Sequence, residues 1–150
     1  MRKVLLAIGT VLALGSALAI GNLAPSVALR GGYAGTAAFG LEASWNCILY
    51  QPPVGALRPT LDLGYAGGFS GSFAMRYLTG LPGVKGLRLG GGAGLGYGGG
   101  FFGLVRGDLE YDLPVSGLPA PLFLGADAGY AFAFSGGGSP FVAAKLGVRF

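Results

Sequence analysis

The chain has 150 residues, of which 52% are hydrophobic, 11% are charged and 32 are glycine, with a formal net charge of +4. So few charges, of mixed sign, give no reason to expect a nucleic-acid partner. One cysteine, Cys47, and no histidine are present, which excludes an internal disulfide and disfavours a metal or catalytic site built on these residues. We therefore expect Cys47 to serve in packing.

Residues 1–19 have the pattern of a cleaved signal peptide. Arg2 and Lys3 precede an apolar stretch at 4–14, and the Ala-Leu-Ala of residues 17–19 is typical of a cleavage site. A membrane-anchor helix is the alternative, but the stretch is short and interrupted by glycine. Residues 20–150 would then form the mature domain, in which no apolar run approaches the roughly 20 residues of a spanning helix.

A tyrosine recurs along the mature chain at intervals of 32, 32 and 33 residues, at Tyr33, Tyr65, Tyr97 and Tyr130. Each precedes a glycine-rich break, and two of the units are nearly identical, LGYAGGF at 63–69 and LGYGGGF at 95–101. Four units of strand, tight turn and strand predict eight antiparallel strands. We place these strands at 26–34, 38–49, 57–66, 69–78, 87–97, 101–113, 121–132 and 140–150.

Charged and apolar residues alternate along these segments. In 101–113, Arg106, Asp108 and Glu110 share one face, and Val105 and Leu109 share the other. An even number of such strands in an exported, apolar chain is typical of an all-β, eight-stranded antiparallel up-and-down transmembrane β-barrel. A basic side chain facing lipid near mid-membrane costs roughly 2–4 kcal/mol, so the charged face must point into the lumen.

The inward face collects every charge of the mature chain except Lys85, which falls in a loop. These residues are Arg30, Glu42, Arg58, Asp62, Arg76, Arg88, Arg106, Asp108, Glu110, Asp112, Asp127, Lys145 and Arg149. The lumen of an eight-stranded barrel is just wide enough for side chains to fill it. We therefore predict that Arg58, Arg76, Arg88 and Arg106 bridge to Asp62, Asp108, Glu110 and Asp127, and plug the lumen. Inward glycines at 90, 92, 94 and 96 leave room for Phe102, Leu104 and Arg106.

Aromatic residues are expected to form two girdles, one at each membrane–water interface. The outer set comprises Tyr33, Phe39, Tyr65, Phe69, Tyr97, Phe101, Tyr130 and Phe132, and the periplasmic set comprises Tyr50, Tyr77, Tyr111 and Phe150. A carbohydrate-binding platform is the alternative interpretation. With both termini in the periplasm, the tight breaks at 35–37, 67–68, 98–100 and 135–139 face outside. The longer, proline-containing connections at 50–56, 79–86 and 114–120 then face the periplasm.

Two motifs suggest chemistry and are better explained by the barrel. Gly94, Gly96 and Gly99 match the GxGxxG nucleotide-binding pattern, but a strand follows them where that site needs a helix. The carboxylates Asp108, Glu110 and Asp112 could form a metal or acid–base site, yet a charge-paired lumen face accounts for them. Without histidine, or a general base near Ser or Cys, we expect no enzyme activity and no cofactor.

The last strand carries Val142, Ala144, Leu146, Val148 and the terminal Phe150 on one face. This alternation resembles the signal that outer-membrane barrels present to their insertion machinery. With the export signal and eight strands, the chain resembles the small OmpA/OmpX/OmpW-like barrels over its whole mature length. The resemblance implies an outer-membrane location, membrane lipids and the insertion machinery as partners, and a monomer. The short outer turns depart from that family and argue against adhesion or ligand capture by projecting loops.

Three functions are compatible with a barrel of this size. The first is a structural role in the envelope. The second is an OmpW-like conduit for small hydrophobic molecules, suggested by inward Phe102, Leu104 and Phe141. The third, a soluble lipocalin-like carrier, needs an apolar inside and a polar outside, which is the reverse of this charge pattern. Few Asn and Gln residues, and more Arg than Lys, also favour a thermophilic source.

Overall fold

The computed structural model describes residues 24–115, 117 and 120–150, which form a closed antiparallel barrel with each strand paired to the next and β8 paired to β1. The strands are β1 (Ser26–Tyr33), β2 (Ala37–Ser44), β3 (Ala56–Tyr65), β4 (Phe69–Gly80), β5 (Leu87–Tyr97), β6 (Phe101–Asp112), β7 (Leu122–Ala133) and β8 (Gly138–Arg149). The eight-stranded all-β fold predicted from the sequence is confirmed. The predicted signal peptide lies outside the described residues. Within them, no helix is long and apolar enough to cross a membrane.

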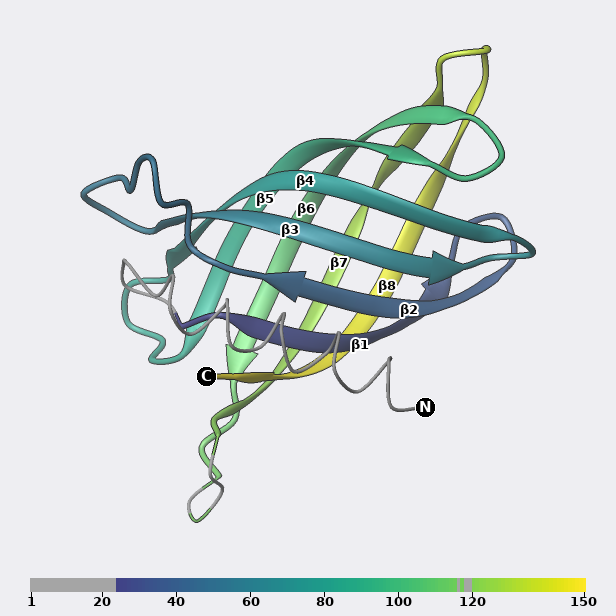
Figure 1. Cartoon of the computed structure of the whole chain (residues 1–150). Helices are drawn as coiled ribbons and strands as arrows, with labels where there is room; N and C mark the ends of the chain where they lie inside the picture. Colours follow the sequence, from purple (N-terminus) through teal and green to yellow (C-terminus); the bar gives the residue numbers. More distant parts are fainter. Residues whose placement is uncertain (1–23, 116, 118–119) are drawn as a thin grey trace, which may run out of the picture.

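The two ends of the barrel differ in their connections (Figure 1). Tight turns gather at one end, here named the turn end, and the longer connections and the C-terminus lie at the other, named the loop end. Three of the turns repeat one geometry, with a central glycine of positive φ at Gly35 (75°), Gly67 (74°) and Gly99 (75°). In each, the amide before this glycine donates to the carbonyl after it, at 2.9–3.0 Å. The 32-residue sequence repeat is therefore a repeat of hairpin geometry.

Strand β2 ends earlier than predicted, at Ser44 instead of residue 49. The next ladder position on β3 is Pro59, which accepts a bond from the Trp45 amide but has no N–H to return one. Beyond it, the side chain of Gln51 accepts from the Leu57 amide at 3.2 Å and donates to the Cys47 carbonyl at 2.9 Å. A side chain thus replaces the strand partner, and regular pairing stops. The other strand ends lie within two residues of those predicted.

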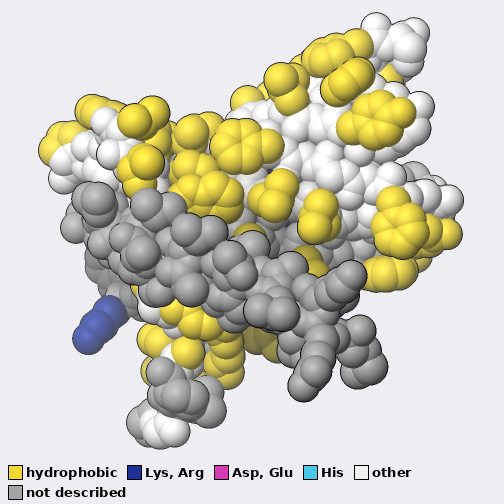
Figure 2. All heavy atoms as spheres, in the orientation of Figure 1, with side chains coloured by type: hydrophobic (Ala, Val, Ile, Leu, Met, Phe, Trp, Pro, Cys, Tyr) yellow, Lys and Arg dark blue, Asp and Glu magenta, His cyan; other side chains and the backbone are white. Residues whose placement is uncertain are grey.

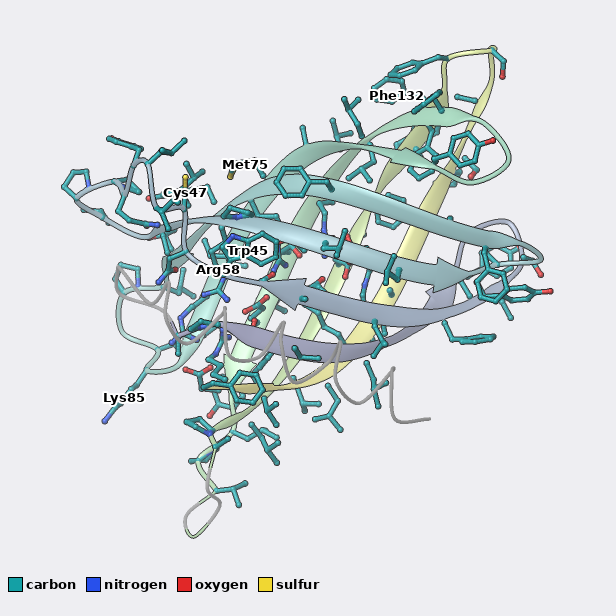
Figure 3. The ribbon with its side chains drawn as sticks, viewed as in Figure 1. Trp45, Cys47, Arg58, Met75, Lys85 and Phe132 are labelled. Carbon is teal, nitrogen blue, oxygen red and sulfur yellow. The ribbon has the colours of Figure 1, made fainter. Side chains whose placement is uncertain are left out.

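The outer surface of the barrel is apolar. Exposed hydrophobic residues follow the outward positions of every strand, among them Leu29, Leu41, Leu63, Phe73, Leu95, Val105, Leu124 and Leu146. Figure 2 shows this layer on one face, with no acidic side chain visible. A basic side chain projects from that view where Figure 3 labels Lys85, in the connection between β4 and β5. The barrel therefore has a charged inside and an apolar outside.

Candidate functional site: the charged lumen

The charged side chains of the strands are gathered inside the barrel. Ten of the thirteen predicted lumen charges are buried, and the other three, Arg30, Arg88 and Asp112, are partly buried. All of them occupy the inward positions of their strands, which are mostly less exposed than the outward positions between them. The strand period therefore brings together residues up to about a hundred positions apart in the sequence.

Glu42 on β2 is the centre of this cluster. Its carboxylate lies 2.9 Å from Arg76 on β4, 2.8 Å from Arg106 on β6 and 3.1 Å from Lys145 on β8, with the Nε of Arg30 at 3.8 Å. The side chain is buried to 1% exposure. One carboxylate thus links strands on different sides of the barrel through its lumen.

Two further carboxylates on β6 continue the network toward the loop end. Asp108 contacts Arg76 at 2.8 Å, Arg106 at 2.9 Å and Lys145 at 3.2 Å. Glu110 contacts Lys145 at 2.9 Å and Arg149 at 2.6 Å, and Arg76 more distantly at 3.3 Å. Because Arg76 and Lys145 are shared by both carboxylates, these pairs form one connected network.

Toward the turn end, Arg30 is the last cation of the network. Its guanidinium donates to Asp62 at 2.9 Å and to Asp127. Arg106 reaches the same two carboxylates, at 2.9 Å from Asp62 and 3.2 Å from Asp127. Two arginines and two aspartates from β1, β3, β6 and β7 therefore cross the lumen at this level. Arg suits such sharing because its planar guanidinium offers several donors at once.

Two neutral hydroxyl groups complete the hydrogen bonding of Arg76. Arg76 donates to Thr60 at 2.7 Å and to Ser44 at 2.5 Å, and these two hydroxyls bond to each other at 2.8 Å. Both residues occupy inward positions, as the alternation along their strands indicates. Neither was named from the sequence, because only charged residues were considered there. Buried ion pairs persist only where the remaining donors and acceptors find partners.

Two predicted pairings were wrong. Arg58 is fully buried, but among the described residues no carboxylate lies within ion-pair distance of it. It donates instead to Ser26 Oγ and to the carbonyls of Ala24 and Ser44, at 3.0–3.2 Å. It lies toward the loop end of the barrel (Figure 3). Arg88 pairs with Asp112 at 2.6 Å, and not with any of the four predicted carboxylates.

Glycine shapes the wall against which these side chains pack. A Cβ at Gly92 would lie 2.3 Å from the Met75 carbonyl oxygen and 2.9 Å from Arg76 Cγ, so glycine lets β4 and β5 approach closely beside the Arg76 stem. The sequence predicted that these glycines leave room for large side chains, and Phe102 lies over Gly96 in this way. A Cβ at Gly96 would lie only 2.3 Å from the Phe102 ring. At Gly92 the nearest side chain is that of Arg76, not that of Arg106.

Apolar side chains that sequence reasoning missed are buried toward the loop end. Phe123 is fully buried, with the Arg149 guanidinium 4.2 Å from its ring centroid. Ala56 and Leu78 are also fully buried and contact each other. All three lie an even number of residues from the charged residues of their own strands. The alternation that placed the charges in the lumen therefore predicts inward positions for these residues too. Apolar side chains and the buried Arg58 therefore lie together toward the loop end.

The carboxylates of this network have little capacity to hold a metal ion. Oxygens of Glu42, Asp108 and Asp127 lie within 4.8 Å of one another. Each of these carboxylates already has at least two cationic side chains within ion-pair distance. A cation would have to displace them. Asp108, Glu110 and Asp112, the trio for which the sequence favoured charge pairing over a metal site, likewise pair with Arg76, Arg88, Lys145 and Arg149.

The aromatic residues of both proposed girdles are exposed on the outer surface. At the turn end, ring centroids lie 5.6 Å apart for Phe39 and Tyr65 and 5.2 Å apart for Tyr65 and Phe69. The Tyr97–Phe101 pair repeats the second contact at 5.2 Å. Trp45 and Phe73, which the girdle prediction omitted, face each other at 6.4 Å. At the loop end, the amide of Phe150 donates to the Pro25 carbonyl at 2.9 Å.

Comparison with known proteins shows a similarity of fold and no similarity to a known family. No protein-family model matches the chain, and no curated protein matches it. Among solved structures, the N-terminal β-barrel domain of Pseudomonas aeruginosa OprF is similar, with a TM-score of 0.62 and 17% sequence identity. The match covers 87% of this chain and all of that one. The barrel is therefore shared, and any function must be argued from the residues of this chain.

The network predicts a large difference between two arginine-to-alanine substitutions. Arg106→Ala leaves Glu42, Asp62, Asp108 and Asp127 short of a buried counter-charge and should lower the free energy of unfolding by about 3–5 kcal/mol. Arg88→Ala removes a pair at the lumen edge, where the side chains are 20% and 27% exposed, and should cost less than about 1 kcal/mol. Urea unfolding of both variants in the same detergent measures the difference. Equal costs would show that the central charges are not coupled as described.

Proposed function

We propose that this protein is an integral outer-membrane β-barrel with a sealed lumen and a structural role in the cell envelope. A closed barrel satisfies every strand hydrogen bond internally, which is the condition for strands to cross a lipid bilayer. The apolar outer face and the aromatic residues toward both ends match the membrane core and its two interfaces. The fold shared with the OprF barrel domain is consistent with this location.

The burial of the central ion pairs is the observation that carries the structural role. The side chains of Arg76, Asp108 and Lys145 are 0% exposed, and those of Glu42 and Arg106 are 1% exposed. An aqueous path through the barrel would have to wet these groups. Toward the loop end, Phe123 and Leu78 are also fully buried. The burial of both sets of side chains supports a lumen without a continuous channel.

The alternative function, a conduit for small hydrophobic molecules, is supported by the structure of the turn end only. Phe102, Leu104 and Phe141 line a cavity at the turn end, as that hypothesis requires. The same cavity ends on Arg30, Asp62 and Arg106, whose ion pairs cross the lumen. An apolar molecule moving onward would have to separate buried ion pairs, which makes transport through the barrel the weaker proposal. A soluble carrier is opposed by the apolar outer face.

The same proposal assigns orientation and partners. Export with a cleaved signal peptide would leave both ends of the barrel domain in the periplasm, so that the loop end faces the periplasm and the turn end faces outside. Membrane lipids surround the apolar face, and the insertion machinery would recognise β8, whose outward residues lead to Phe150. The barrel closes within one chain, so a monomer suffices.

The location predicts how the protein behaves on fractionation. It should sediment with outer membranes, require detergent for extraction, and migrate differently on gels before and after boiling, because the closed strand network resists cold detergent. A well-characterised periplasmic protein in the same cells provides the soluble control. Recovery as a detergent-free periplasmic monomer would refute the membrane assignment.

The sealed lumen predicts the electrical behaviour of the purified protein in planar bilayers. The wild-type barrel should show no steady ion conductance. Replacing the central pair by Glu42→Ser and Lys145→Ser keeps the net charge but removes two side chains from the middle of the lumen, and should introduce channel openings. The matched double variant Arg88→Ser and Asp112→Ser, at the edge of the lumen, should stay silent. Large, steady conductance from the wild type would overturn the sealed-lumen proposal in favour of a channel.

A further inference from the structure

A cavity of about 180 Å³ occupies the turn end of the lumen, beyond the ion-pair network. Seven of the eight strands contribute to its lining, all except β5. Its rim includes Tyr33, Ala34 and Ala66, at or beside the tight turns, so the cavity opens at that end of the barrel. The structural role proposed above makes no use of this space.

The floor of the cavity is polar, but its charges are paired. Arg30 and Asp62 are 17% and 10% exposed, and they hold each other at 2.9 Å. The second oxygen of Asp62 accepts from Arg106 at 2.9 Å, and the Ser72 hydroxyl lies 3.4 Å from it. A molecule resting on this floor meets hydrogen-bonding groups but no unpaired charge on Asp62. Ser70 and Ser139 add hydroxyl groups to the wall.

The walls are held open by two aromatic rings that lie against glycines. A Cβ at Gly96 would come within 2.3 Å of Phe102 Cζ, and one at Gly129 within 2.7 Å of Phe141 Cζ. Each ring therefore occupies the space that a neighbouring side chain would have filled. This placement keeps both rings against the sheet, so that the centre of the lumen remains available and presents apolar surface.

We propose that this cavity binds a small uncharged molecule that combines an apolar ring or short chain with one hydroxyl or carbonyl group. The apolar part lies between Phe102, Leu104 and Phe141, and the polar group faces Arg30, Asp62 and Ser72. A cavity of about 150 Å³ lined by apolar side chains is known to admit benzene, so this one has room for a monocyclic compound. Binding goes beyond the structural role and needs no passage through the barrel.

The paired floor explains why the ligand is uncharged. A carboxylate or an ammonium group entering the cavity would lose its hydration, which is costly unless a free counter-charge replaces the water. Arg30 already faces Asp62 and Asp127, and Arg106 faces four carboxylates. A charged group could gain a partner only by breaking one of these pairs. A hydroxyl or carbonyl needs only one hydrogen bond at the exposed edge of the floor.

Three fluorinated probes of equal size test both the site and the charge rule. These are 4-fluorobenzyl alcohol, 4-fluorobenzoate and 4-fluorobenzylammonium, each titrated into the full barrel in detergent micelles, with empty micelles as the reference. Fluorine NMR should show saturable binding of the alcohol, and binding of either ion weaker by at least about tenfold. Amide signals of Ser72, Ala131 and Ala143 should shift with the alcohol, whereas that of Ser26, at the loop end, should not.

A matched pair of substitutions on β7 locates the binding. Ala131 lines the cavity and Ala128 faces outward on the same strand. Ala131→Phe should abolish saturable binding of the alcohol, and Ala128→Phe should leave it unchanged. The mobility of unboiled protein on gels verifies that each barrel is closed. If Ala131→Phe does not fold, Ala38→Leu fills the cavity from β2 and should have the same effect.

Several results would overturn the proposal. Binding of the alcohol no greater than to empty micelles would exclude the site. Equal loss of binding in Ala128→Phe would place the probe on the lipid-facing surface. Tighter binding of an ion than of the alcohol would show that the floor presents an available charge. None of these outcomes bears on conductance, so the sealed lumen is tested separately.

Discussion

The structure depends on a carboxylate, that of Glu42, shared by cations from four other strands in the middle of a narrow lumen. An apolar outer face leaves the interior as the only place for the charges of the strands, and the narrow lumen brings them into contact. Removed from water, these charges are stable only as pairs with further hydrogen bonds. Each inward Arg, Asp and Glu therefore limits what its neighbours can be, and the network sets the shape of the lumen.

Three levels follow from this constraint. At the loop end, Phe123 and Leu78 are fully buried, as is Arg58. In the middle, the side chains of Glu42, Arg76, Arg106, Asp108 and Lys145 are buried in ion pairs. At the turn end the charges stop at Arg30 and Asp62, and glycines with aromatic rings beside them leave a cavity. The proposed structural role and the proposed binding of a small molecule therefore rest on different levels of the same lumen: the first on the ion pairs, and the second on the cavity at the turn end.

The sequence was sufficient for the fold because two independent periods agree: the two-residue alternation of charge and the 32-residue repeat of the turns. The alternation also assigned an inward position to each charged residue of the strands. It could not assign partners, because pairing depends on the stagger between strands and on the reach of each side chain. Arg58 illustrates this, since it bonds to backbone carbonyls and to Ser26, and to no carboxylate of the described residues. The early end of β2 likewise depends on Gln51 replacing a strand partner, which no periodic pattern reveals.

A double-mutant cycle between Glu42 and Lys145 tests most directly whether the lumen charges act as one coupled network. Glu42→Gln and Lys145→Met remove the charge with little change in shape, and the two groups lie 3.1 Å apart across the lumen. Unfolding free energies of both single variants and of the double variant, in one detergent, give the coupling energy. The account predicts that the double variant is more stable than the sum of the single losses implies, by about 1–3 kcal/mol. Strictly additive losses would contradict it, because they would mean that the two buried charges do not depend on each other.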